Sequence, residues 1–95
     1  MSQPSDPHPG ILDDLRRKID HVDDKIVDLL AQRFKLISEL SEIKKRDGLS
    51  PYQIERERDI LKRVVERGGQ NGLNRLLLQA LFLRIFAVSK REQAQ

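Results

Sequence analysis

The sequence contains no cysteine, and this absence excludes several kinds of site. Without cysteine, the 95 residues can form no disulfide framework, thiolate-bound metal site or cysteine nucleophile. Only His8 and His21 remain as imidazole ligands, and they lie thirteen residues apart in the chain. We therefore expect no zinc site and no other bound metal.

Aromatic residues and long apolar runs are also scarce. Aromatic side chains make up 4% of the chain and hydrophobic residues 38%, so any core must be mainly aliphatic. The apolar runs are far shorter than the roughly 18–20 residues that cross a membrane. The first ten residues lack the basic and apolar regions of a signal peptide, and we expect a cytoplasmic protein.

Neither sign of charge dominates the chain. Residues 11–49 carry nine basic and nine acidic side chains, whereas residues 50–95 carry nine basic and five acidic ones. Mixed charges at this density indicate solvated helix faces. A nucleic-acid-binding protein would more often show a one-sided basic stripe with stacking aromatic residues, so we expect no nucleic-acid partner.

Glycine and proline are absent from three long stretches, residues 11–47, 52–67 and 73–95. This distribution predicts an all-α chain of three helices joined by short turns. Residues 1–10 contain three of the four prolines and are expected to be a disordered tail. Residues 11–95 are expected to form one domain, because the chain is too short for two.

The first helix is expected over residues 11–46, with Asp13 and Asp14 in its first turn. Its apolar positions are three or four residues apart, as in an amphipathic helix: Leu12, Leu15, Ile19, Val22, Ile26 and Leu29. Such a helix would be about 54 Å long, whereas a compact globule of this size has a radius of gyration of about 12 Å. Two shorter helices cannot cover so long a rod, and we therefore expect an obligate homodimer.

The second and third helices have clear start and stop signals. Ser50-Pro51-Tyr52-Gln53 has the pattern of a capping box with proline at the first helical position. Gly68-Gly69 is expected to end the second helix near Arg67. The third helix is expected to begin near Leu73 and is apolar on most of its sides, which is typical of a helix surrounded by others.

Three cations lie on or beside the apolar stripe of the first helix. Arg16 could extend its stem along the stripe and its head into water, and Lys44 could interact with the helix C-terminus. Arg33 is harder to explain in this way, because the residues three and four positions away are all apolar. A buried cation needs a partner, and an anionic ligand such as a small dicarboxylate is one that fits.

Polar residues also extend an apolar face of the third helix. Ser89 and Gln93 follow Phe82 and Phe86 at steps of three and four, although fraying of the chain end would also explain Gln93. The run 55–59 near the start of the second helix has the composition of an ordinary charged face. The residues alone thus predict a helical dimer with a cationic pocket.

Three segments together resemble the all-helical chorismate mutases. The runs 15–23, 29–33 and 43–44 resemble the first helix of that family, Ile54-Glu55-Arg56-Glu57-Arg58 resembles its second, and Ser89 with Gln93 matches its third. The match is in register from about residue 11 to residue 93. The resemblance implies a standalone single-domain enzyme in an intertwined homodimer with two equivalent, shared active sites.

The resemblance also implies an activity and roles for individual residues. The family converts chorismate to prephenate by a Claisen rearrangement, for the synthesis of phenylalanine and tyrosine, without a cofactor. Carried over by resemblance, Arg33 and the partner subunit's Arg16 would bind the substrate carboxylates, and Lys44 would donate to the ether oxygen. The remaining substrate-binding positions would be Gln53, Arg56, Glu57, Ser89 and Gln93, of which Gln93 would also donate to the ether oxygen and Glu57 would accept from the ring hydroxyl.

Gln53 departs from the family pattern, because well-known members have aspartate at this position near the substrate hydroxyl. Other functions on the same fold therefore stay open: an isochorismate–pyruvate lyase, a 4-amino-4-deoxychorismate mutase, or a non-catalytic helical dimerisation module. A plain dimer seam would favour leucine or isoleucine at the cationic positions, which argues against the last of these. Regulation, including stimulation by a partner enzyme, is not indicated by the sequence.

Overall fold

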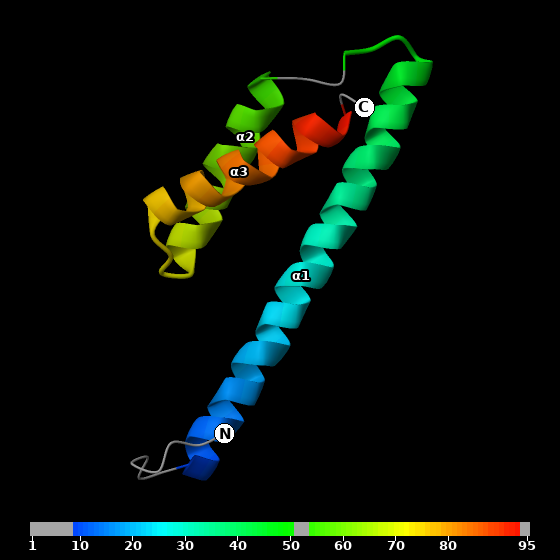
Figure 1. Ribbon diagram of the computed structural model, residues 1–95. Coiled ribbons are helices and arrows are strands. Elements are labelled where there is room, and N and C mark those ends of the chain that lie inside the picture. Colours follow the sequence, from blue (N-terminus) through cyan, green and yellow to red (C-terminus); the bar gives the residue numbers. More distant parts are fainter. Residues whose placement is uncertain (1–8, 51–53, 94–95) are drawn as a thin grey trace. The chain divides into compact units, whose positions relative to one another are not determined.

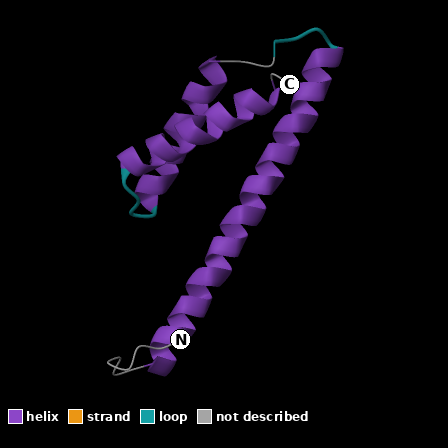
Figure 2. Cartoon of the chain, in the orientation of Figure 1, coloured by secondary structure: helices purple, strands orange, loops and turns teal. Residues whose placement is uncertain are grey.

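The protein is all-helical in a computed structural model that describes residues 9–50 and 54–93. Three helices account for most of the described residues, and none of these residues lies in a strand (Figure 2). Helix α1 is Pro9–Arg46, α2 is Ile54–Gln70 and α3 is Arg75–Gln93. The all-α class and the number of helices predicted from the sequence are confirmed.

The chain divides into two compact units, residues 1–35 and residues 36–95. In the first unit, the described residues are the N-terminal part of α1. The second unit contains the last turns of α1 together with α2 and α3, which run side by side (Figure 1).

Helix α1 begins two residues before the predicted start, at Pro9 rather than Ile11. Proline is favoured at a first helical position, because its fixed φ suits the helix and its missing N–H needs no partner there. As a consequence Asp13 and Asp14 fall outside the first turn, which contains no acidic residue, and this part of the prediction is wrong.

The C-terminus of α1 lies at the predicted residue, Arg46. Gly48 has a φ of 72°, its N–H donates to the Lys45 carbonyl at 3.2 Å, and the Leu49 N–H donates to the Lys44 carbonyl at 2.7 Å. These two bonds form a Schellman motif, in which a glycine with positive φ closes the last turn.

Helix α2 does not end at Gly68-Gly69, and that prediction is wrong. The helix continues to Gln70 and ends with a second Schellman motif at Gly72, whose φ is 74°. The Gly72 N–H donates to the Gly69 carbonyl at 3.1 Å, and the Leu73 N–H donates to the Gly68 carbonyl at 2.8 Å. Both glycines therefore supply carbonyl groups to the closing turn instead of breaking the helix. The predicted capping box includes residues 51–53, which lie outside the described residues.

Helix α3 begins at Arg75, two residues after the predicted start near Leu73, because Asn74 acts as its N-cap. The Asn74 Oδ1 accepts hydrogen bonds from the backbone N–H groups of Leu76 at 2.7 Å and Leu77 at 3.2 Å. Asparagine is among the preferred N-cap residues, since its side-chain oxygen satisfies N–H groups that have no partner within the helix.

The buried apolar side chains lie on α2 and α3, and they form the small core of the second unit. They are Ile60, Leu78, Ile85 and Phe86, which are 4–8% exposed. The rings of Phe82 and Phe86 also meet edge to face, with centroids 6.2 Å apart. Gly68 is buried where α2 passes Leu78 on α3, and the lack of a side chain at this position allows the close approach.

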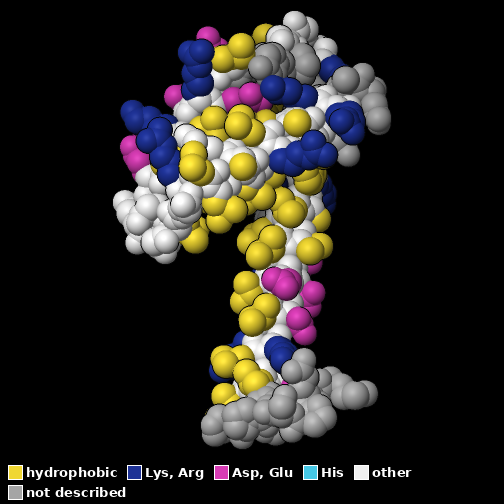
Figure 3. All heavy atoms as spheres, turned by 60° about the vertical axis from the view of Figure 1, so that its left-hand side comes forward, with side chains coloured by type: hydrophobic (Ala, Val, Ile, Leu, Met, Phe, Trp, Pro, Cys, Tyr) yellow, Lys and Arg dark blue, Asp and Glu magenta, His cyan; other side chains and the backbone are white. Residues whose placement is uncertain are grey.

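No apolar side chain is buried among the described residues of the first unit. The apolar stripe predicted for α1 is present along one helix, but its side chains are exposed, with Leu15 at 50%, Ile19 at 58% and Ile26 at 51%. Figure 3 shows hydrophobic side chains following one another along α1. A single amphipathic helix has little stability of its own, so this stripe requires an apolar partner surface.

Candidate active site

Glu57, in the first turn of α2, forms an ion pair with a residue of α3. The Lys90 Nζ lies 3.2 Å from the Glu57 Oε1. The Glu57 side chain is 23% exposed and the Lys90 side chain is 42% exposed, so the pair is partly open to solvent. It places a carboxylate and an ammonium group together where α2 and α3 pack against each other.

Ser89 lies beside Lys90 in the sequence and is buried, at 6% exposure. Its Oγ donates a hydrogen bond to the Ile85 carbonyl, 2.8 Å away and one turn earlier in α3. A hydroxyl group that donates in this way still has lone pairs that can accept. The position combines a small polar group with a largely apolar stretch of helix, as the spacing of the sequence suggested.

Lys44 and Arg56 belong to the same unit as Glu57 and Ser89. Lys44 is half-buried near the end of α1, and Arg56 is exposed on α2. The second unit therefore contains six of the predicted site residues, and the side chains of four of them are described: two cations, one carboxylate and one neutral hydroxyl. Arg56, Glu57 and Ser89 belong to the packed pair α2 and α3, whereas α1, which contains Lys44, makes no backbone contact with either helix.

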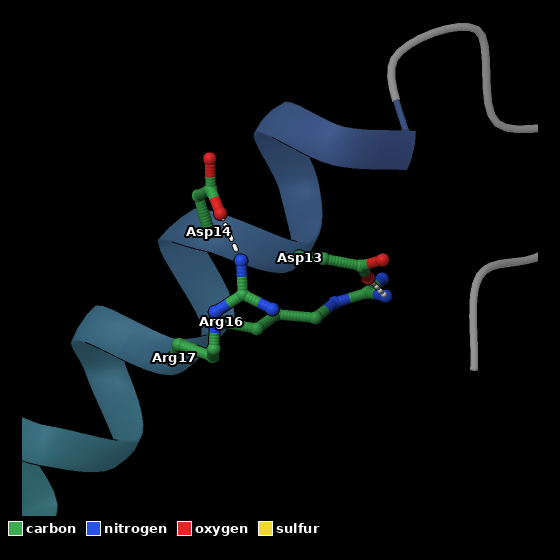
Figure 4. Close-up of polar contacts among 4 residues, drawn as sticks. All are labelled: Asp13, Asp14, Arg16 and Arg17. Atoms are coloured by element: carbon green, nitrogen blue, oxygen red, sulfur yellow. Dashed lines mark hydrogen bonds and ion pairs between the residues drawn. The ribbon is translucent and has the colours of Figure 1, made fainter.

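The other two predicted cations, Arg16 and Arg33, lie in the first unit on α1. Arg16 is exposed and its Nη1 lies 3.7 Å from the Asp13 carboxylate, one turn earlier. Arg17 forms a similar pair with Asp14 (Figure 4). Arg33 is half-buried. Seventeen residues of continuous helix separate the Cα atoms of Arg16 and Arg33 by about 25 Å, too far for both side chains of one chain to hold one small ligand.

Two predicted site residues are not placed. Gln53 lies outside the described residues. Gln93 is the last residue of α3, and only its backbone is described.

Sequence reasoning missed two residues of the second unit. Lys90 pairs with Glu57, and Ser41 is a buried hydroxyl group, 5% exposed, one turn before Lys44. The Ser41 Oγ has no hydrogen-bond partner among the described residues. The available signal for Ser41 was its spacing, since it lies four residues after Ile37 and therefore on the same face of the helix.

The described residues contain neither a cluster of metal ligands nor a membrane-spanning helix. No three His, Asp or Glu side chains of the described ranges gather closely enough to hold a metal. No helix of these ranges is both long and apolar enough to span a bilayer.

Comparison with known proteins identifies a family. Residues 15–94 match the family model described as chorismate mutase type II. A chorismate mutase from Methanocaldococcus jannaschii is 40% identical over 53 residues, which cover 56% of this chain and 54% of that protein.

Two longer relatives are similar to parts of the chain. A bifunctional chorismate mutase/prephenate dehydratase from Buchnera aphidicola is 35% identical over 74 residues, covering 78% of this chain and 19% of that protein. A T-protein from Enterobacter agglomerans is 49% identical over 47 residues, covering 50% of this chain and 13% of that protein. The chain thus spans less than a fifth of these two relatives and about half of the Methanocaldococcus protein.

Proposed function

Because the chain belongs to the chorismate mutase type II family, we propose that it catalyses the rearrangement of chorismate to prephenate. The family match carries this proposal, since it runs from residue 15 to residue 94 and includes every candidate site residue from Arg16 to Gln93. The relative from Methanocaldococcus jannaschii is itself named a chorismate mutase. The family match favours neither a lyase nor a non-catalytic module.

The chemistry suits the side chains present. In this rearrangement a carbon–oxygen bond breaks as a carbon–carbon bond forms, without a proton transfer, a covalent intermediate or a cofactor. An enzyme accelerates such a step by holding the reactive conformer and by stabilising the charge that develops in the transition state. Cations and amides are sufficient for both tasks, and a cysteine-free chain can supply them.

The proposed roles follow the family resemblance. Arg33 and Arg16 of the partner subunit bind the two substrate carboxylates, for which the guanidinium fork is well shaped. Lys44 and Gln93 donate hydrogen bonds to the ether oxygen as it becomes negative. Ser89 assists at a carboxylate, Glu57 accepts from the ring hydroxyl, and Arg56 lines the pocket.

Gln53 belongs to the hydroxyl end of the proposed site. Glutamine has a side-chain oxygen that can accept a hydrogen bond and a backbone N–H that can donate one, as aspartate has. The glutamine side chain, however, carries no charge. We therefore propose that the site keeps its activity with glutamine at residue 53 and that Glu57 is the charged group near the substrate hydroxyl.

The proposed enzyme is a homodimer that shares its active sites between subunits. Two observations support this state: the apolar stripe of α1 is exposed, and Arg16 lies about 25 Å along the helix from Arg33. Pairing the long helices of two chains would cover the stripe, and it would allow the two arginines of one site to come from different chains.

One assay tests the activity directly. Purified protein is mixed with chorismate, and the loss of chorismate absorbance is followed. Because prephenate is an isomer of chorismate and has the same mass, the product is identified by its proton NMR spectrum. Prephenate is the expected product. Unchanged chorismate, or release of pyruvate, would contradict the proposed reaction.

The oligomeric state is tested by sedimentation. The expected mass is about twice the 11.0 kDa of one chain, with an unfolding midpoint that rises with protein concentration. A folded monomer at micromolar concentration would exclude both the dimer and the shared site.

A further inference from the structure

The ion pair between Glu57 and Lys90 joins two residues that are 33 positions apart in the sequence and come from different helices. We propose that Lys90 is a positioning residue that orients the Glu57 carboxylate and makes the site prefer a neutral hydroxyl group over a cationic amino group. This inference rests on the proposed function, in which Glu57 accepts from the ring hydroxyl of the substrate.

The geometry allows Lys90 to orient Glu57 without occupying all of its acceptor capacity. The Lys90 Nζ lies 3.2 Å from the Oε1 of Glu57. An ionised carboxylate has two oxygens that accept hydrogen bonds, so a contact at Oε1 leaves Oε2 able to accept from a ligand. A glutamate side chain has several rotamers, and a contact from the neighbouring helix restricts it to few of them. The carboxylate is therefore oriented before the ligand arrives.

The charge of Lys90 also changes which ligand group suits Glu57. A lone carboxylate attracts an ammonium group more strongly than a hydroxyl group, because the first interaction joins two opposite charges. The Lys90 ammonium offsets the negative charge of Glu57 and repels a second cation placed on the other side of the carboxylate. A neutral hydroxyl group keeps its hydrogen bond and experiences no such repulsion.

A purely structural role for the pair makes a different prediction. Ion pairs with this degree of exposure contribute little to stability, and both side chains remain partly in solvent. If Lys90 only joined α2 to α3, its removal would alter stability slightly and would affect all substrates equally. Discrimination between two substrates separates the two roles.

The experiment compares chorismate with its analogue that has an amino group in place of the ring hydroxyl. Both kcat and KM are measured for the wild type and for Lys90→Met, Lys90→Gln and Lys90→Arg, with folding checked by circular dichroism. The exposed Arg84 of α3 provides the matched control as Arg84→Met, which removes a cation from the same helix.

We expect the removal of the Lys90 charge to change the preference of the enzyme between chorismate and the amino analogue. In Lys90→Met and Lys90→Gln, the ratio of kcat/KM for chorismate to that for the amino analogue should fall about threefold to tenfold. Lys90→Arg should keep the wild-type ratio, since it restores the charge, and Arg84→Met should keep it as well. In a Glu57→Gln background, Lys90→Met should no longer change the ratio.

Two outcomes overturn the proposal in distinguishable ways. If the wild type converts chorismate but both neutral variants keep its ratio within twofold, Lys90 has no positioning role and the proposed function stands. If the wild type converts neither substrate, the proposed function and the role of Lys90 fail together.

Discussion

Gly68 of α2 lies directly against Leu78 of α3. A Cβ atom added at Gly68 would stand 3.2 Å from the Leu78 Cγ and would overlap the Leu78 Cδ1. Both residues are buried, and they belong to the small core that joins the two helices. The separation of α2 and α3 is thus set at this point by the absence of a side chain.

Gly68→Ala should therefore destabilise the protein. The added methyl group forces Leu78 or a helix to move, and overpacking of this kind costs about 1–3 kcal/mol. Gly69→Ala is the matched control, because nothing lies within 4 Å of its added Cβ. Since alanine is the better helix former, that variant should gain up to about 1 kcal/mol. Urea unfolding at one protein concentration measures both, and equal effects would contradict the close contact.

The N-cap of α3 provides a second test of local structure. Asn74→Ala removes the acceptor of two backbone N–H groups and should cost about 1 kcal/mol in the free energy of unfolding. Asn74→Ser should retain most of the stability, because serine is an equally good cap. An alanine variant as stable as the serine variant would show that the cap contributes nothing measurable.

The shared site is tested by mixing two inactive variants. Arg16→Ala and Arg33→Ala homodimers should each lose nearly all activity, because every site in them lacks one arginine. After subunit exchange, each mixed dimer has one site with both arginines, so activity should return towards half of the wild-type value per mixed dimer. Proven mixed dimers without recovered activity would contradict sites built from two chains.

The proposed role of Gln93 predicts a pH-dependent defect. The wild-type rate should be nearly flat from about pH 5 to 8, because the reaction needs no proton transfer. In Gln93→Glu, the new carboxyl group donates a hydrogen bond only while it is protonated, and it repels the ether oxygen once ionised. Activity should therefore be greatest at low pH and fall as the pH rises through the carboxyl pKa, which is ordinarily about 4.3 for glutamate.

The size of that defect can be estimated. Loss of one donor to a developing negative charge typically lowers the rate by about 10²–10³-fold. A Gln93→Asn variant is the control, since it keeps an amide at a slightly shorter reach and should show no pH dependence. Wild-type activity of Gln93→Glu at pH 7.5 would remove Gln93 from the ether oxygen.

Much of the fold could be predicted from the sequence because helix signals are local. The spacing of Leu12, Leu15 and Ile19 and the glycine at residue 48 determine α1 and its end within a few residues. The family resemblance could also be recognised without coordinates, since it depends on residue types at fixed spacings along three helices. The match over residues 15–94 confirms it.

The end of α2 and the partner of Glu57 were decided by tertiary structure. Two consecutive glycines weaken a helix by their backbone freedom, but contact between Gly68 and Leu78 favours the helical form, and the helix ends at Gly72 instead. Glu57 has several cations near it in the sequence, yet it pairs with Lys90, 33 residues away. The sequence by itself determined which segments are helical and which family they form, because those signals arise between neighbouring residues. The contact of Gly68 with Leu78 and the pair of Glu57 with Lys90 were decided only by the packing of α2 on α3. Each depends on how closely and in what register two separate helices meet.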